Sequence, residues 1–189
     1  MRKEPLLPGN IYHIYNRGVN YGDIFFTRAN RIFFLRRLRD YCPAEQGAVV
    51  AYCLMPNHYH LIVQVAADSF GLTAMQPLMV SYTKAINKQE QRVGAIFQGP
   101  FQARRVTTDG DLVHLSRYIH LNPVAAGFVA SPEDWEFSSY PEYIGRRAGT
   151  LPQPESVLRH FSSPAAYAEY VCGPADPRAG LLKSLLIDD

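Results

Sequence analysis

Apolar and polar positions along the chain follow a period of two in some stretches and a helical period in others. Four stretches are β-rich and predict strands: residues 11–16, 48–54, 58–65 and 101–107. The second and third strands flank Met55, Pro56 and Asn57, and Pro and Asn are residues typical of tight turns. The sequence therefore predicts a hairpin whose second strand begins at His58.

Three further stretches carry apolar side chains at helical spacing and predict helices: residues 28–41, 72–92 and 109–121. Thr27 is a suitable N-cap for the first helix. Asp109 and Asp111 lie where the third helix begins, at the end of a helix that favours negative charge. Pro123 and Gly127 are expected to close the third helix.

The order of these elements is β-α-β-β-α-β followed by a helix. It predicts an α+β fold of the ferredoxin-like type, an antiparallel sheet with helices on one face, to which the third helix is added. We expect a catalytic domain over residues 1–147 and a C-terminal helical extension over residues 148–189. Proline-rich spots in the extension flank a short helical piece at residues 165–171.

Composition and charge add a candidate partner. The 189 residues are 47% hydrophobic and 19% charged, which is typical of a globular protein. The net charge of +2 conceals a split, because residues 1–107 hold 13 Lys and Arg against 6 Asp and Glu, whereas residues 108–189 hold 6 against 11. A basic front portion favours a polyanionic partner such as nucleic acid, and the alternative is a solvated helix face.

Cysteine usage and apolar runs indicate the compartment. The three cysteines, at positions 42, 53 and 172, are widely spaced and form no C-x-x-C pair. A disulfide framework or a cysteine zinc site is therefore not expected, and a reducing cytosol fits. Because we find no apolar leader at the N-terminus and no apolar run of about 18 residues, we expect a cytoplasmic protein with no membrane partner.

The strongest local signal for chemistry is His58-Tyr59-His60 on the third predicted strand. Side chains two positions apart on a strand point to the same side, so both imidazoles face one way and Tyr59 faces the other. Two neutral imidazoles this close can hold one divalent metal ion. The alternative is two unrelated polar side chains on a solvent-facing strand.

A second candidate group lies on the third predicted helix. His114, Tyr118 and Asn122 are spaced four apart and share one helix face. Asn122 offers a carbonyl oxygen, a suitable third ligand for Mg²⁺ or Mn²⁺. Tyr118 offers a phenol as a covalent nucleophile, although an aromatic residue on such a helix is usually part of the core. His120 points elsewhere and is interpreted as structural.

Together these residues suggest phosphoryl transfer. The metal would polarise a phosphate, and Tyr118 would attack the phosphorus and form a 5′-phosphotyrosine link that can be resealed. Simple hydrolysis has no need of a tyrosine, because a metal-bound water would serve. The residues therefore favour cutting and rejoining over plain nuclease activity.

Several motifs in this order resemble those of the REP-associated tyrosine transposases, single-tyrosine HUH transposases of the insertion-sequence type: residues 12–18, 55–63, 97–101 and 116–124. The resemblance covers about residues 8–145. It implies that His58 and His60 bind the metal, that Asn122 matches a third ligand, and that Tyr118 attacks DNA. It also implies a substrate of single-stranded, hairpin-forming palindromic DNA and an enzyme that acts as a metal-dependent endonuclease and strand transferase. Of a monomer and a homodimer, the monomer is favoured.

Candidate DNA contacts lie outside the metal site. Arg17, Arg104 and Arg105 are predicted to bind phosphates, and Tyr12 and Tyr15 to stack on bases. Two alternatives remain at this point. One is an insertion-sequence transposase that mobilises its own gene, and the other is a DNA- or RNA-binding regulator that kept the fold without the chemistry. The regulator would not require the two histidines, the tyrosine and the asparagine together.

Overall fold

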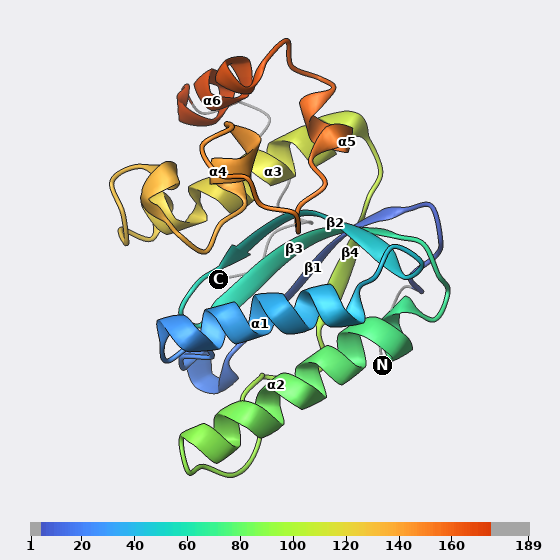
Figure 1. Cartoon of the computed structure of the whole chain (residues 1–189), viewed down its shortest axis with the longest axis vertical. Helices are drawn as coiled ribbons and strands as arrows, with labels where there is room; N and C mark the ends of the chain where they lie inside the picture. The colour runs from blue at the N-terminus through green and yellow to red at the C-terminus, as the bar shows by residue number, and fades with distance from the viewer. Residues whose placement is uncertain (1–4, 175–189) are drawn as a thin grey trace.

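A four-stranded antiparallel sheet occupies the middle of the computed structural model, which describes residues 5–174 (Figure 1). The strands are β1 (Ile11–Arg17), β2 (Gly47–Leu54), β3 (His58–Val65) and β4 (Gln102–Val106). Their order across the sheet is β2-β3-β1-β4, and each neighbouring pair is antiparallel. The arrangement confirms the predicted ferredoxin-like α+β fold, with β1 and β3 at the centre.

The two crossover helices, α1 (Arg28–Tyr41) and α2 (Gln76–Gln89), cover one face of the sheet (Figure 1). The predicted cap of α1 is confirmed, because the Thr27 hydroxyl accepts a hydrogen bond from the Asn30 amide and the Asn30 side chain accepts one from Thr27. A π-helical turn, η2 (Gly71–Met75), precedes α2. Both helices bury aromatic and aliphatic side chains against the sheet.

The opposite face of the sheet carries the helices that follow β4, beginning with α3 (Asp109–Ala125). The others are η3 (Pro132–Asp134), α4 (Tyr140–Tyr143), α5 (Glu155–Leu158) and α6 (Pro164–Cys172). A second apolar core therefore forms between this face and α3 to α6, separate from the core under α1 and α2. Because both faces are covered, β2 and β3 are buried almost along their whole length.

The helix α3 runs further than the sequence predicts. Pro123 was expected to close it, but the helix continues to Ala125 with Pro123 inside it. Proline removes only one hydrogen bond, and the chain continues to bond beyond it, from the Ala126 amide to the Asn122 carbonyl at 2.9 Å. Gly127, at a φ of 74°, follows the end of the helix, as expected of a glycine after a C-terminus.

The described part of the predicted C-terminal extension, residues 148–174, packs on α3. Val157, Tyr167 and Val171 are fully buried in the second core. The predicted short helix is confirmed as α6, and residues 175–189 lie outside the described part of the chain. Over residues 5–174, no helix is both long enough and apolar enough to cross a membrane.

Candidate active site

The two histidines of the H-x-H motif lie side by side at the start of β3. Their ring centroids are 4.9 Å apart. His60 faces the side of the sheet that carries α3, because its ring contacts Tyr118, whereas Tyr59 is buried in the core under α1 and α2. The predicted alternation along the strand is therefore confirmed.

Asn122 reaches both histidines from α3. Its side-chain oxygen lies 3.2 Å from His58 Nε2, and its side-chain nitrogen lies 3.3 Å from His60 Nε2. Asn122, which follows the two histidines by more than sixty positions in the sequence, thus meets them around one point. The structure brings together the three residues that the sequence predicts as metal ligands.

The other ring nitrogen of each histidine, Nδ1, also has a polar partner. His58 Nδ1 lies 2.7 Å from the Asn57 side-chain oxygen, and His60 Nδ1 lies 2.9 Å from His13 Nε2. Amide oxygens only accept hydrogen bonds, and the shorter of the two contacts of His58, to Asn57, favours the tautomer with its proton on Nδ1. The lone pair of His58 Nε2 then points at Asn122, which is the orientation that a metal-binding histidine needs.

Burial keeps the second histidine neutral. His60 is fully buried, and this burial, together with the nearby His13 and His58, holds its pKa well below the ordinary value. A neutral imidazole can donate its lone pair to a metal at physiological pH, whereas a protonated one cannot.

The donor set fits a divalent cation. Within the described residues, no group of three or more His, Cys, Asp or Glu side chains forms a metal site, so a metal here would depend on the Asn122 amide. The lone pair of His58 Nε2 and the Asn122 oxygen are both electron donors and lie 3.2 Å apart. A cation shared between them would have both atoms as ligands. Two imidazoles and an amide oxygen suit Mn²⁺, and also Mg²⁺ with further oxygen ligands.

Tyr118 lies beside the candidate ligands. Its ring meets the His60 ring edge to face at a centroid distance of 5.5 Å. It lines a pocket of about 280 Å³ together with His58, Asn122 and Arg17. One turn of α3 separates Tyr118 from Asn122, so the predicted shared helix face is confirmed.

Two nearby tyrosines, Tyr59 and Tyr82, are enclosed by the first core. Tyr59 and Tyr82 are fully buried there, and burial raises the pKa of both phenols. The Tyr82 hydroxyl also donates a hydrogen bond to the Ile24 carbonyl at 2.6 Å. Neither ring can reach a phosphate at the Tyr118 pocket.

Known proteins are similar to this chain in part of its sequence and in its fold. No protein-family model matches the chain. A curated protein of Haemophilus influenzae, named as a REP-associated tyrosine transposase, is 30% identical over 110 residues, which cover 52% of this chain and 62% of that relative. The chain therefore spans less than two thirds of the relative's length. The predicted resemblance to the REP-associated tyrosine transposases is confirmed.

A solved structure agrees with the fold. It is the structure of a REP-associated tyrosine transposase bound to a REP hairpin, and it matches with a TM-score of 0.64 at 19% identity. The match covers 86% of this chain and 94% of the other. At this level of identity the match concerns the fold alone.

The predicted DNA contacts fall in different places. Arg17 lines the Tyr118 pocket, and it also lines a neighbouring hollow of about 460 Å³ together with Arg104 and Tyr15. Tyr15 is only 8% exposed, and its ring tilts against His13. Arg105 follows Arg104 on β4 and so points to the other side of the sheet.

The prediction for Tyr12 is wrong. Its side chain is 1% exposed and belongs to the core under α1 and α2. Its hydroxyl accepts a hydrogen bond from the Leu7 amide and donates one to the Pro5 carbonyl. The alternation of β1 places it opposite the site, and the N-terminal arm covers it, so it cannot stack on a base.

The spacing of the sequence motifs does not predict three further residues of the site. His13 and Asn57 orient the two histidines, and Tyr21 lines the Tyr118 pocket. Asn57 precedes His58 directly and could have been suspected from that position. The places of His13 and Tyr21 depend on strand register and loop conformation.

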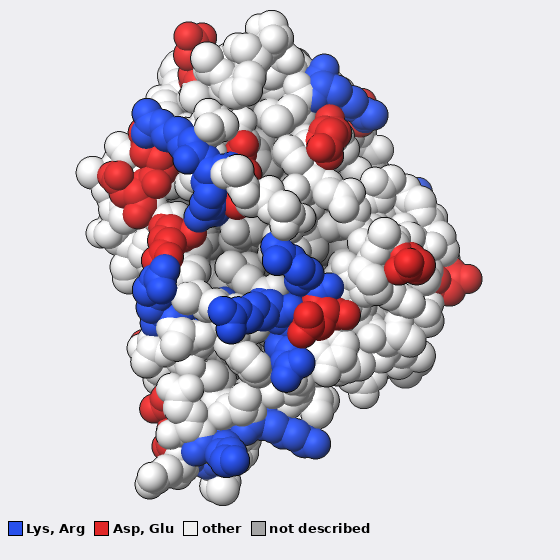
Figure 2. Space-filling model, in the orientation of Figure 1, with Lys and Arg blue, Asp and Glu red and all other residues white. Residues whose placement is uncertain are grey.

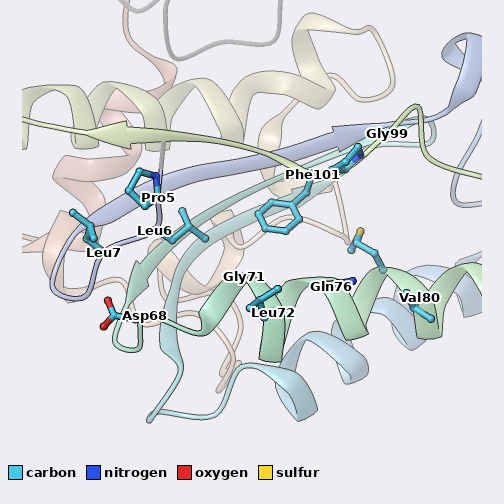
Figure 3. A pocket seen from close by; sticks show the side chains of 12 residues that line it. Pro5, Leu6, Leu7, Asp68, Gly71, Leu72, Gln76, Val80, Gly99 and Phe101 are labelled. Carbon is cyan, nitrogen blue, oxygen red and sulfur yellow. The ribbon is translucent and has the colours of Figure 1, made fainter. Parts of the chain in front are cut away.

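A larger cavity, of about 660 Å³, lies away from this site (Figure 3). Leu6 of the N-terminal arm, Leu72 of η2 and Phe101 before β4 are among the side chains around it, and most of its wall is apolar. None of the predicted site residues lines it.

Proposed function

We propose that this chain binds single-stranded hairpin DNA, cuts it and rejoins it through a covalent link to Tyr118. The observation that carries the proposal is the meeting of Tyr118, His58 and Asn122 around one pocket, with His60 buried against Asn122 and Tyr118. A regulator without chemistry has no need for a phenol beside two oriented imidazoles and an amide. The relative from Haemophilus influenzae and the hairpin-bound structure support the same reading.

In the proposed reaction one phosphodiester is exchanged for another. The phenol of Tyr118 loses its proton, and its oxygen forms a bond to phosphorus. The bond from phosphorus to the 3′ oxygen breaks, and that oxygen takes up a proton to leave as a 3′ hydroxyl. A 3′ hydroxyl can reverse the step and reseal the strand, so no outside energy source is required.

His58, His60 and Asn122 would hold Mg²⁺ or Mn²⁺ in this reaction. The ion would neutralise charge that develops on the phosphate oxygens. His13 and Asn57 would keep the two imidazoles turned toward Asn122.

The charge distribution supports a nucleic-acid partner. Figure 2 shows Lys and Arg gathered over α1 and α2, whereas acidic side chains are mixed with basic ones over the C-terminal helices. Arg36 and Arg39 on α1 and Lys84 and Lys88 on α2 are exposed. These helices lie on the face of the sheet opposite Tyr118, so the patch would attract DNA at long range and would not hold it in the site.

The test is the covalent adduct itself. The full chain is incubated with end-labelled hairpin oligonucleotides from the DNA beside its own gene, with and without Mn²⁺ or Mg²⁺. On a denaturing gel, we expect an adduct for the parent and none for Tyr118→Phe, with Tyr82→Phe as the matched control. Mass spectrometry of the digested adduct should place the nucleotide on Tyr118.

An adduct on another tyrosine would contradict the assignment of the nucleophile. Hairpin binding without any metal-dependent cleavage would favour the regulator instead.

A further inference from the structure

A short turn after β1 places an aromatic ring at the mouth of the Tyr118 pocket. The turn contains η1 (Val19–Tyr21), and Tyr21 is among the residues that line the pocket. The side chain is 58% exposed, which makes it one of the few large apolar side chains left open to solvent in the described chain.

The backbone of this turn is strained. Asn20 and Tyr21 both have positive φ angles, 54° and 59°, in the left-handed region. Bulky side chains rarely adopt this conformation, because the Cβ atom crowds the backbone. Of the three non-glycine residues with positive φ in residues 5–174, Tyr21 is the only aromatic one.

Contacts with the site hold the turn in this conformation. The Asn57 side chain donates a hydrogen bond to the Tyr21 carbonyl at 3.2 Å, and the Gly18 amide donates one to the Asn57 carbonyl at 2.8 Å. A Cβ atom on Gly18 would lie 1.8 Å from the Gly22 carbonyl oxygen, so the turn requires glycine there. Asn57 also contacts His58, and one residue therefore sets the position of both the ring and a candidate metal ligand.

The exposed ring does not offset its backbone strain by core packing. Strained residues of this kind are found where surrounding structure holds them for a function. The guanidinium of Arg17 lies 4.6 Å from the centre of the ring and covers one side of it. An aromatic ring beside an arginine is a typical arrangement for holding a base by stacking and its phosphate by charge.

We propose that Tyr21 is a positioning residue that stacks on the base next to the phosphate attacked by Tyr118. The proposal rests on the proposed function and names how the single strand is aligned in that site. The ring, and not its hydroxyl, carries this role, so Tyr21→Phe should behave as the parent. Loss of one stacked base should weaken strand binding about tenfold.

The test uses the full chain with Tyr118→Phe, without divalent metal, so that the DNA stays intact. The probes are hairpin oligonucleotides from the DNA beside the gene, with 2-aminopurine at one position of the single-stranded flank at a time. We expect fluorescence quenching at one position in this parent and in its Tyr21→Phe variant. Tyr21→Ala should lose the quenching at that position and bind about tenfold more weakly.

Two further variants keep the result interpretable. Phe26 is 40% exposed and has Arg92 over its ring at 5.9 Å, but it does not line the pocket, so Phe26→Ala should quench as the parent does. Glycine suits the left-handed backbone, so Tyr21→Gly should keep an equal or higher thermal midpoint and still lose the quenching.

Unchanged quenching in Tyr21→Ala, or equal loss in Phe26→Ala, would overturn the stacking proposal. If the chain with Tyr118 intact forms the adduct in that case, the proposed function stands without it. If neither binding nor adduct is seen with Tyr118 intact, the proposed function fails and the stacking proposal fails with it.

Discussion

Single residues in the site act through the orientation of their neighbours. His58 has one ring nitrogen against Asn57 and the other against Asn122, so its proton and its lone pair have defined places. His60 is oriented in the same way between His13 and Asn122. The candidate metal site is therefore preorganised by side chains from β1, β3, α3 and the turn before β3.

Removing either histidine should separate binding from cleavage. We expect His58→Ala and His60→Ala to lower the rate of metal-dependent cleavage by roughly two orders of magnitude or more. Hairpin affinity should stay within about threefold of the parent, because it comes from many phosphate contacts. Gel shift and cleavage assays on the same oligonucleotide measure both. His160→Ala, far along the chain on the surface near Asp109, is the control. Comparable metal-dependent cleavage by the double variant would remove the basis for the metal site.

At the scale of elements, the edge strand β4 places its two arginines on opposite faces. Arg104 pairs with His13 and so lies on the face that carries the site, whereas Arg105 pairs with Tyr12 and lies on the other face. Of these two arginines, only Arg104 lines the hollow that Arg17 also lines. A strand of DNA that crosses β1 and β4 toward Tyr118 would meet Arg104 and Arg17.

The salt dependence of binding tests this path. Replacing Arg17 or Arg104 by alanine should each reduce the slope of log K against log salt by about one unit, as one phosphate contact is lost. Arg105→Ala should change the slope by much less and serves as the matched control. Equal effects of Arg104→Ala and Arg105→Ala would mean that the DNA does not follow this face of the sheet.

The helix α3 is attached to the C-terminal helices by a buried polar group. His120 Nδ1 lies 2.7 Å from the Tyr167 hydroxyl, and His120 Nε2 lies 2.9 Å from the Ser139 hydroxyl. This confirms the structural interpretation of His120. Burial lowers the pKa of His120 to about 3, so the folded protein keeps it neutral.

Acid should destabilise the fold through His120. In the unfolded chain His120 binds a proton near pH 6.5, whereas in the folded chain it does so only near pH 3. The unfolded state binds more protons between these values, so stability falls as the pH drops through this window. We expect His120 to lower the free energy of unfolding of the parent by about 1.4 kcal/mol between pH 7.5 and pH 5.5. Urea unfolding at the two pH values measures this loss, and His120→Gln should lack it.

Tyr167→Phe is the matched control for this pH effect. It removes the hydrogen bonds of the Tyr167 hydroxyl to His120 and to Ser116 and leaves the imidazole able to titrate. Its stability should be about 1 kcal/mol lower at pH 7.5, and the pH dependence should match the parent. If His120→Gln kept the full pH dependence of the parent, the acid sensitivity would have another source.

At the scale of the whole molecule, the sheet lies between two cores, and the second core needs the C-terminal part. Val157, Tyr167 and Val171 bury their side chains against α3, which carries Tyr118 and Asn122. Arg117 on α3 donates hydrogen bonds to the carbonyls of Tyr170 and Gly173. The position of α3, and with it that of Tyr118, therefore depends on residues outside the predicted catalytic domain of residues 1–147.

Two shortened chains test this dependence. One ends at Pro174 and the other at Arg147, so the difference between them isolates residues 148–174. Each large buried apolar side chain contributes about 1.5–3 kcal/mol. We expect the free energy of unfolding of the shorter chain to be lower by at least about 4 kcal/mol, or its cooperative unfolding to be lost. Equal stability of the two chains, measured by urea unfolding, would show that residues 1–147 fold independently.

Properties that are local to one element could be predicted from the amino-acid sequence. The bounds of α1 and β3 follow from apolar periodicity and the Thr27 cap, and they agree with the structure. The opposite directions of Tyr59 and His60 follow from the pleat of a strand, and the shared face of Tyr118 and Asn122 follows from the turn of a helix. These relations hold wherever the elements are placed.

How the elements meet depends on the packing of the whole chain and could not be predicted. The packing of α3 on the face opposite α1 and α2 brings Asn122 to the two histidines. The register of β4 on β1 leaves Arg104 on the site face, and the N-terminal arm covers Tyr12. The left-handed turn at Tyr21 is likewise held by a contact with Asn57. These contacts cannot be predicted from a local sequence pattern. They depend on which apolar faces pack against each other, and those faces lie far apart in the chain.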